Sequence, residues 1–237
     1  MVTGAARRLG RAIALALAEQ GCHVVVHYHH SEEQAIRLCR ELQEYRINAM
    51  ALQADLSNPQ QTQGLFEQAL DAAGPVSILI NNASIYPAET LTEVSAQSFE
   101  ANMRIHGLAP LLLSRLMAQQ GIEGQIVNML DTRAVTGDPK HWTYHLSKRT
   151  LTDLTTLLAL ELAPSMTVNG VAPGLILPPP GRDESYLQHL AHTNPLHRYG
   201  HPRDITDAVL FLLTSTFMTG QILFIDGGHH MKGRLYV

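Results

Sequence analysis

Short apolar runs alternate with longer amphipathic segments along the whole chain. In runs such as Val24 to Val26 and Ile78 to Ile80, consecutive residues are apolar, so both faces of each strand are expected to be buried. Parallel strands with two buried faces need helices on both sides of their sheet. The alternation therefore predicts an α/β fold, in which helices cover both faces of a doubly wound parallel seven-stranded sheet.

Size and composition indicate a single domain. The 237 residues suffice for one α/β domain with a full core, and no repeat, low-complexity tract or linker divides residues 1–237. The formal charge of -4 and the charged fraction of 16% argue against nucleic-acid and membrane partners. The chain has no long apolar run and no signal-like start, and Cys22 and Cys39 do not form a C-x-x-C site. We therefore expect a cytoplasmic protein with reduced thiols.

The hydrophobic pattern sets the expected order of the elements. Strands are expected at 23–29, 49–54, 76–80, 126–130, 167–172 and 222–226, and helices at 11–20, 95–119, 142–163 and 204–213. The first strand is unusual, because only Met1 and Val2 precede the turn that follows it, where a central strand commonly has about five residues. We expect Ser57 and Ser95 to begin the helices that follow them.

A glycine turn follows this first strand. Residues Thr3 to Gly10 read T-G-A-A-R-R-L-G, directly before a helical segment rich in Ala and Leu. Such a turn lets backbone amides and a helix dipole meet a pyrophosphate, which indicates a Rossmann-like nucleotide site. The usual dinucleotide fingerprint has a further glycine where Arg8 stands. A plain glycine turn is the alternative.

The end of the second strand bears on the choice of nucleotide. It lacks the acidic residue that would bind a ribose 2′-hydroxyl, and His29, His30 and Ser31 follow instead. Neutral or cationic donors suit a 2′-phosphate, and Arg8 can approach from the first turn, so NADP(H) is preferred over NAD(H). The alternatives are a surface strand end for the histidines, His27 included, and a capping box begun by Ser31. A metal site is not expected, because no further ligand pattern is present.

A tyrosine and a lysine provide the strongest candidate for chemistry. Tyr144 and Lys148 are four residues apart at the start of a helical segment, so their side chains share one face. An ammonium group beside a phenol lowers the pKa of the phenol, which makes Tyr144 a proton donor or acceptor. Asp131 ends the apolar run I-V-N-M-L and should face the same place. A solvated helix face is the alternative for the pair, and a packed helix histidine is the reading favoured for His106.

Loops at the carboxyl ends of the strands line the ligand crevice in such a sheet. They hold Asp55-Leu56, N-N-A-S at Asn81 to Ser84 with Tyr86 beyond, and Pro173-Gly174. The segment from Leu175 to Tyr199 has three consecutive prolines at 178 to 180, which disfavour regular structure. We expect this segment to form a substrate lid.

Five motifs occur in one order over nearly the whole chain: T-G-x-x-x-x-x-G, N-N-A, Y-x-x-x-K, V-N-x-V-x-P-G and D-G-G. The sequence thereby resembles the short-chain dehydrogenase/reductase family. Arg8, H-Y-H-H-S after the second strand, N-N-A-S and Asp131, thirteen residues before Tyr144, resemble the pteridine reductases and the bacterial dihydromonapterin and dihydrofolate reductases. His30 replaces an arginine of the pteridine reductases. His106 stands where the wider family has an asparagine.

The resemblance implies an NADPH-dependent reductase of pterins or folates. The implied cofactor-binding residues are Gly4, Arg8, Leu9, His29, His30, Ser31, Asp55, Leu56, Asn82, Ala83, Tyr144, Lys148, Pro173 and Gly174. The implied substrate contacts are Arg8, Ser84, Tyr86, Asp131, Tyr144 and Leu175, with Tyr86 stacked on the pterin. The implied catalytic residues are Asp131, Tyr144 and Lys148.

Reduction of a carbon–nitrogen double bond requires a proton on nitrogen, so an acid such as Asp131, its pKa raised by burial, is expected to share a proton with Tyr144. A ketone reductase of the same family, acting on acyl-carrier thioesters or steroids, and a non-catalytic NADPH-binding sensor are the alternatives. The family resemblance also implies a homotetramer formed through residues 95–119 and 142–163. The tail from His229 to Val237 is expected to be a frayed end, or else to reach a neighbouring subunit.

Overall fold

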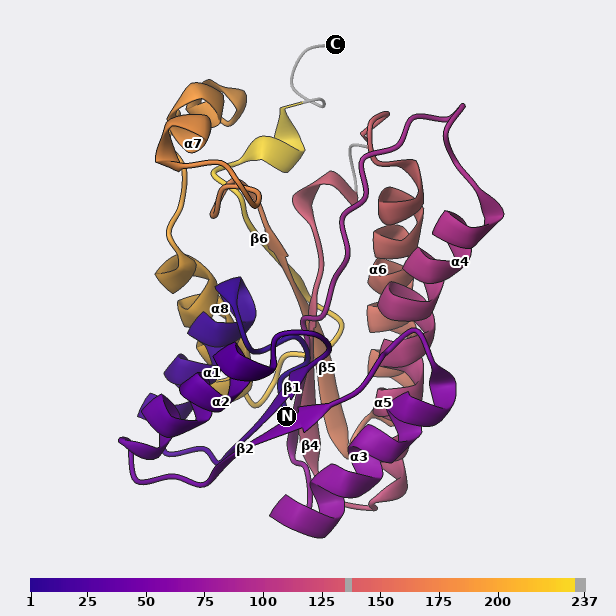
Figure 1. Cartoon of the computed structure of the whole chain (residues 1–237), viewed down its shortest axis with the longest axis vertical. Coiled ribbons are helices and arrows are strands. Elements are labelled where there is room, and N and C mark those ends of the chain that lie inside the picture. The colour runs from indigo at the N-terminus through magenta and orange to yellow at the C-terminus, as the bar shows by residue number, and fades with distance from the viewer. Residues whose placement is uncertain (135–137, 233–237) are drawn as a thin grey trace.

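The computed structural model describes residues 1–134 and 138–232. The final part of the tail, residues 233–237, lies outside the described residues, and so does the segment 135–137 between Asp131 and Tyr144. Figure 1 shows a central sheet between two groups of helices, with the loops that follow the strands gathered at one end of the molecule.

The sheet is parallel throughout. Its strands are β1 (Val24–Tyr28), β2 (Ala49–Gln53), β3 (Ile78–Asn81), β4 (Gly124–Met129), β5 (Met166–Pro173) and β6 (Ile222–Ile225). β1 pairs with β2, and β3, β4, β5 and β6 pair in that order. The buried V-V-V of β1 has the two-faced burial predicted for such a sheet.

Val2 joins the two halves of the sheet. It forms parallel bridges to Val26 on one side and Ile80 on the other. Within residues 1–134 and 138–232, the structure has six strands plus this bridging residue in place of the seven predicted, because Thr3 and Gly4 already turn away from the sheet. In the described residues, the first strand is reduced to this bridge, and the sheet changes winding direction at this point.

Helices cover both faces of the sheet (Figure 1). One face carries α1 (Arg8–Glu19), α2 (Glu32–Gln43) and α8 (Pro202–Thr214), whose apolar sides share one core cluster with the sheet. The other face carries α3 (Pro59–Ala73), α5 (Ala109–Gln119) and α6 (Trp142–Leu162), with a second cluster. α4 (Ala96–Met103) packs against α6 and continues through a π-helical turn (Arg104–Leu108) into α5. The doubly wound arrangement predicted from the sequence is confirmed.

The helix starts agree only in part with the sequence. Ser95 caps α4, since its hydroxyl accepts a hydrogen bond from the backbone N–H of Ser98. Asn58, not Ser57, caps α3, because the Ser57 hydroxyl instead donates to Asp55 at 2.9 Å. α2 begins directly after Ser31 without a hydrogen bond from the Ser31 side chain.

A buried polar chain ties α6 to the sheet. The Asn81 amide donates to Asn128 on the neighbouring strand at 2.8 Å, and the Asn128 amide donates to the Thr155 hydroxyl at 2.9 Å. Thr155 in turn donates to the Leu151 carbonyl within α6 at 2.7 Å. Satisfied polar groups in a core specify one arrangement, so this chain sets the position of the helix that begins near Tyr144.

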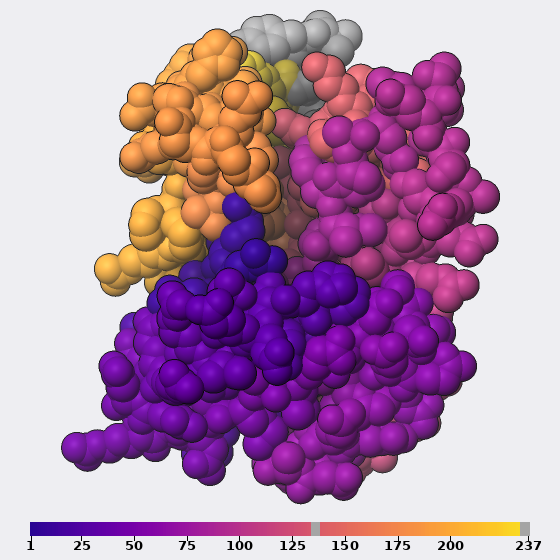
Figure 2. Space-filling view, in the orientation of Figure 1, coloured from indigo at the N-terminus to yellow at the C-terminus, as the bar shows by residue number. Residues whose placement is uncertain are grey.

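The segment from Leu175 to Tyr199 leaves the sheet and returns. Gly200 N–H donates to the Leu175 carbonyl at 2.9 Å, which closes the two ends of the excursion. The expectation of no regular structure is wrong beyond the prolines, where Asp183 caps α7 (Glu184–Leu190) and a 3-10 turn (Ala191–Thr193) follows. Figure 2 shows the surface hollowed between this segment and the region of α4.

The described part of the tail is held in place. His230 N–H donates to the buried Asp226 carboxylate at 2.8 Å, and the His230 ring lies 2.9 Å from the same oxygen. The expectation of a frayed end is therefore wrong for residues 229–232. Among the described residues, no helix is long and apolar enough to cross a membrane.

Candidate active site

The glycine turn packs tightly enough to bring its backbone to the start of α1. Gly4 has a φ of +61°, and a Cβ at this residue would lie 2.9 Å from the Cα of Ala83. A Cβ at Gly10 would lie 2.3 Å from the Gly4 carbonyl oxygen. Arg8 adopts a φ of 56°, which is the left-handed conformation that explains why the usual fingerprint has glycine here. This backbone fits a pyrophosphate at the start of a helix of 12 residues.

His27 supports this turn through hydrogen bonds from within the core. Its Nδ1 accepts a hydrogen bond from Gly4 N–H at 3.0 Å, and its Nε2 donates to the Ala54 carbonyl at 3.1 Å. The surface position considered for His27 is therefore wrong, because β1 turns the residue into the core. Burial lowers the pKa of His27 to about 4, so the ring is neutral at physiological pH. Nothing in the one-dimensional pattern distinguished it from His29.

The end of β1 presents a pair of exposed histidines. The His29 and His30 rings lie 3.5 Å apart between centroids, and Ser31 follows half-buried. At the end of β2, the Asp55 carboxylate accepts hydrogen bonds from the backbone and hydroxyl of Ser57. These bonds outweigh burial and hold the pKa of Asp55 below its usual value. Leu56 is buried beside them.

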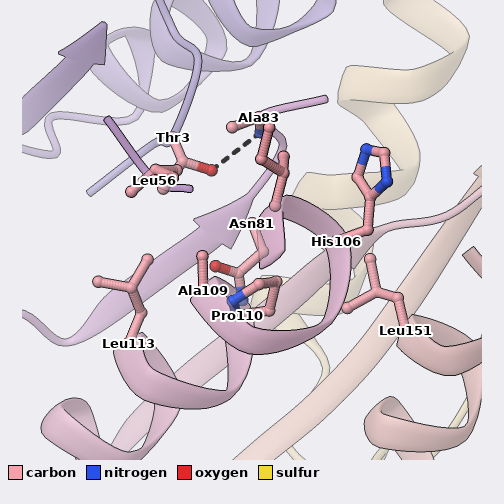
Figure 3. A pocket seen from close by; sticks show the side chains of 10 residues that line it. Thr3, Leu56, Asn81, Ala83, His106, Ala109, Pro110, Leu113 and Leu151 are labelled. Atoms are coloured by element: carbon pink, nitrogen blue, oxygen red, sulfur yellow. Dashed lines mark hydrogen bonds between the residues drawn. The ribbon is translucent and has the colours of Figure 1, made fainter. Parts of the chain in front are cut away.

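Thr3 connects the first turn to the N-N-A-S segment. Its hydroxyl oxygen accepts hydrogen bonds from the N–H groups of Asn82 and Ala83, at 2.8 and 2.9 Å. The Asn82 side chain donates to the Thr3 carbonyl at 2.9 Å. Figure 3 shows Thr3 on one side and His106 on the other side of a cavity of about 10 Å³, which is about one water molecule in size. Thr3 was not among the residues expected at the site.

Asp131, Tyr144 and Lys148 come together as the sequence suggested. The Tyr144 hydroxyl donates to Asp131 Oδ2 at 2.8 Å, and Arg133 N–H donates to Asp131 Oδ1 at 2.7 Å. Lys148 is buried, donates to the Met129 carbonyl at 2.6 Å and lies 5.8 Å from the Tyr144 ring centroid. The carboxylate therefore accepts two hydrogen bonds while the phenol keeps its proton.

The predicted effect of Lys148 on Tyr144 is wrong in this arrangement. Burial raises the pKa of Tyr144 well above its usual value, and the charge and hydrogen bond of Asp131 act in the same direction. Burial also lowers the pKa of Lys148 to about 8, against the opposing attraction of Asp131. Tyr144 is thus a neutral proton donor near pH 7, because its closest charged neighbour is an anion.

An aromatic and charged wall stands beside this pair. Tyr86 stacks on His141 with centroids 3.8 Å apart and meets the Tyr144 ring edge-on at 4.6 Å. Arg133 donates to the Tyr86 hydroxyl at 3.2 Å and pairs with Asp138 at 2.5 Å. Burial raises the pKa of Tyr86 to about 12. Tyr86 is 47% exposed and contacts rings at the start of α6. Sequence reasoning missed Arg133, although it stands two residues after Asp131.

His106 lies behind Tyr144. Its Nε2 is 2.9 Å from the Ser84 hydroxyl, and its Nδ1 is 2.8 Å from the Ser147 hydroxyl. The ring meets the Tyr144 ring edge-on at 5.4 Å between centroids. Burial and the charge of Lys148 hold the pKa of His106 well below its usual value. His106 is buried, as expected, but it links two hydroxyl groups rather than simply filling space.

Arg8 links the nucleotide turn to the lid. Its guanidinium donates to the Pro178 carbonyl at 2.9 Å, next to half-buried Leu9. Pro173 ends β5, and a Cβ at Gly174 would lie 2.6 Å from the Cα of Asp226. The hydrogen bond from Arg8 to Pro178 therefore ties the first turn to the lid segment. Among the described residues, no group of three metal-binding side chains could hold an ion.

Known proteins resemble the chain over nearly its whole length. Residues 4–230 match a family model described as enoyl-(acyl carrier protein) reductase. A 3-oxoacyl-[acyl-carrier-protein] reductase of Synechocystis is 33% identical, with 96% of this chain and 95% of the relative covered. Versicolorin reductase 1 of Aspergillus parasiticus is 32% identical, with 96% and 94% covered.

Solved structures add a different relative. The FolM alternative dihydrofolate reductase 1 of Brucella canis, crystallised with NADP, is 32% identical and superposes with a TM-score of 0.90. The match covers 97% of this chain and 93% of that one. With this fold, the glycine turn and the Tyr144–Lys148 pair, the chain belongs to the short-chain dehydrogenase/reductase family of nicotinamide-dependent oxidoreductases.

Proposed function

We propose that the protein uses NADPH to reduce dihydropterins, such as dihydromonapterin, dihydrobiopterin or dihydrofolate, to the tetrahydro form. The observation that carries the proposal is the 2.8 Å hydrogen bond from the Tyr144 hydroxyl to Asp131. A carbonyl reduction needs only a donor to a developing oxyanion, which a neutral hydroxyl provides. A carboxylate beside the phenol would repel that oxyanion, so its presence favours a nitrogen that must receive a proton.

The proton balance follows from this pair. NADPH supplies the hydride to carbon when it is bound, and one proton must reach the adjacent nitrogen. If Tyr144 alone gave its proton, a phenolate would be left beside the Asp131 carboxylate, and both would be negative at 2.8 Å. The step is therefore expected to take up a solvent proton at Asp131 as Tyr144 donates its own, so that the pair acts as one acid.

The preference for NADPH over NADH rests on the end of β1. β1 is followed directly by His29, His30 and Ser31 rather than by an acidic residue, and these side chains offer donors to a 2′-phosphate. Arg8 is exposed and can turn from the Pro178 carbonyl to a phosphate. Asp55, Leu56, Asn82, Ala83 and Lys148 would hold the rest of the cofactor, on the floor formed by Gly4, Pro173 and Gly174.

A pterin ring would lie between the nicotinamide and the aromatic wall. Tyr86 is exposed next to Tyr144, so its ring is available to a planar substrate, and offset stacking contributes roughly 0.5 to 1.5 kcal/mol beyond area burial. Arg8, Ser84 and Leu175 would contact the same ring from the first turn, the N-N-A-S segment and the lid.

Reduction of a 3-oxoacyl thioester is the second candidate, favoured by the Synechocystis relative. The two functions are separated by following NADPH absorbance with dihydromonapterin, dihydrobiopterin, dihydrofolate and acetoacetyl thioesters in parallel. Turnover of a dihydropterin at least about tenfold faster than of any thioester is expected. Preference for the thioester would refute the proposal, and NADPH binding without any turnover would indicate a sensor.

We also propose a homotetramer assembled through α5 and α6. Leu157 and Leu160 on α6 are 63% and 75% exposed, and Leu111 on α5 is exposed as well. An apolar stripe of this kind on two long helices is typical of a face covered by another subunit.

A further inference from the structure

His106 is the most deeply buried ionisable side chain near Tyr144 that the proposed proton transfer does not use. It is 1% exposed and lies in the π-helical turn between α4 and α5. Single π-helical turns within helices often occur at functional sites. The turn points the ring at two serines from different parts of the chain, Ser84 after β3 and Ser147 in α6.

The neighbouring hydroxyl, carbonyl and backbone N–H groups set the hydrogen-bond directions around His106. The Ser147 hydroxyl, which has one hydrogen, donates it to the Tyr144 carbonyl at 2.7 Å. The bond between Ser147 and His106 must then be donated by the imidazole, so Nδ1 carries the proton. A neutral imidazole has one N–H and one lone pair, which places the lone pair on Nε2.

A second contact supports the same tautomer. The Ile85 N–H, which can only donate, lies 3.4 Å from Nε2. The Ser84 hydroxyl therefore donates to Nε2 at 2.9 Å, which is a closer acceptor than the Ile85 carbonyl at 3.3 Å. Its hydrogen is then turned away from the cleft, and only the lone pairs of Ser84 Oγ remain for a ligand. Ser84 is exposed, so those lone pairs are accessible.

We propose that His106 is a positioning residue that makes Ser84 a hydrogen-bond acceptor, and that the site thereby selects substrates with an N–H group at this place. The inference rests on the proposed function and deepens it. An amino or ring N–H group of a pterin can donate to Ser84. The carbonyl oxygen of a ketone or thioester cannot, because two acceptors would face each other.

A double-mutant cycle tests whether His106 acts through Ser84. Ser84→Ala and His106→Phe are each expected to raise KM for dihydromonapterin about tenfold, the usual effect of losing one hydrogen bond. The double variant should show no further rise, because both changes remove the same interaction. Additive losses overturn the proposal. A matching rise in the Kd of NADPH also overturns it, since the donor would then belong to the cofactor.

A smaller substitution tests the same proposal if His106→Phe fails to fold. Ser147→Ala removes the group that sets the tautomer without touching the ligand, and it should raise KM for dihydromonapterin with little change in kcat. Ser114→Ala is the matched control, because Ser114 is a fully buried helical serine whose hydroxyl has no partner among the described residues. An equal effect of both changes overturns the proposal.

Nitrogen-15 chemical shifts of the histidine ring report the tautomer without any substrate. The wild-type protein should show the Nδ1–H form at pH 7, and Ser147→Ala should show a mixture of both forms. The Nε2–H form in wild-type protein that reduces dihydropterins overturns the inference alone. If the wild-type protein has the Nδ1–H form but reduces only thioesters, the proposed function is refuted, and so is the selection for N–H groups that rests on it. The assignment of the His106 tautomer would remain valid.

Discussion

Replacing Asp131 by asparagine separates proton supply from architecture. Asparagine retains the size of the side chain and one carbonyl oxygen, so it can still accept the 2.8 Å hydrogen bond from Tyr144 or the 2.7 Å bond from Arg133 N–H. It cannot take up a proton from solvent. The substitution therefore removes the acid of the proposed pair and leaves the neighbouring backbone supported.

The expected loss follows from the role of a positioned acid. General acid catalysis contributes about 10²- to 10⁴-fold to a rate, which is about 3 to 5 kcal/mol of barrier. Because Tyr144 remains, we expect kcat for dihydromonapterin to fall by about 10²-fold. The Kd of NADPH should change less than about threefold, since the hydrogen bonds of Asp131 run to Tyr144 and Arg133 and not to the glycine turn within the described residues.

The pH profile gives a second readout with a defined sign. Asp131 raises the pKa of Tyr144 through its charge and its hydrogen bond. Without that charge the pKa of Tyr144 falls, so the loss of activity at alkaline pH should begin at a lower pH in Asp131→Asn. Steady-state rates from pH 6 to 10 check this.

The assay compares kcat from NADPH absorbance with Kd from NADPH fluorescence. Asp71→Asn on the exposed surface of α3 is the control for loss of one charge. Asp131→Ser and Tyr144→Phe should show the same separation between turnover and binding. Equal losses of kcat and cofactor affinity would refute the reasoning, because Asp131 would then be structural.

Three further outcomes follow from the described contacts. Burial lowers the pKa of His27 to about 4 in the folded protein, against an ordinary 6.5, so below pH 6.5 the unfolded chain binds a proton that the folded chain does not. The free energy of unfolding should therefore fall by about 3 kcal/mol as the pH drops from 6.5 to 4. In urea unfolding, His27→Gln should reduce this dependence of stability on pH, and an unchanged dependence contradicts the assignment. Arg8→Gly should raise the KM of NADPH severalfold without lowering Tm, because glycine adopts the left-handed φ of 56° without strain. A lower Tm would show that the hydrogen bond from Arg8 to Pro178 contributes more stability than the strain removes. Leu160→Asp should convert the proposed tetramer to smaller species in light scattering, and an unchanged mass would place the interface elsewhere.

Local pattern was sufficient for the order of the elements. The buried runs of β1 and β4 and the alternation with amphipathic segments predicted a doubly wound parallel sheet, because two-faced burial has few other solutions. The Ser95 cap was equally readable, since a cap depends on groups within a few residues. Ser57 failed as a cap because Asn58, one residue on, accepted the helix N–H groups instead.

The sequence likewise predicted some features of the candidate site and not others. The spacing of Tyr144 and Lys148 and the strand end at Asp131 were visible as sequence, since helix periodicity and strand direction set where these side chains lie. The sequence did not reveal which partner controls the phenol, because that depends on distances across the cleft. Asp131 contacts the Tyr144 hydroxyl, and Lys148 contacts the Met129 carbonyl instead.

By itself, the sequence determined the fold class and the family resemblance, and it named Asp131, Tyr144 and Lys148 as the candidates for proton transfer. Only the tertiary structure decided the state of those residues. The raised pKa of Tyr144, the buried support of His27 and the direction proposed for the Ser84 hydroxyl all depend on burial and on partners distant in the chain. The physical reason is that pattern along a chain reports local geometry, whereas pKa values and hydrogen-bond directions are set by the three-dimensional surroundings of each group.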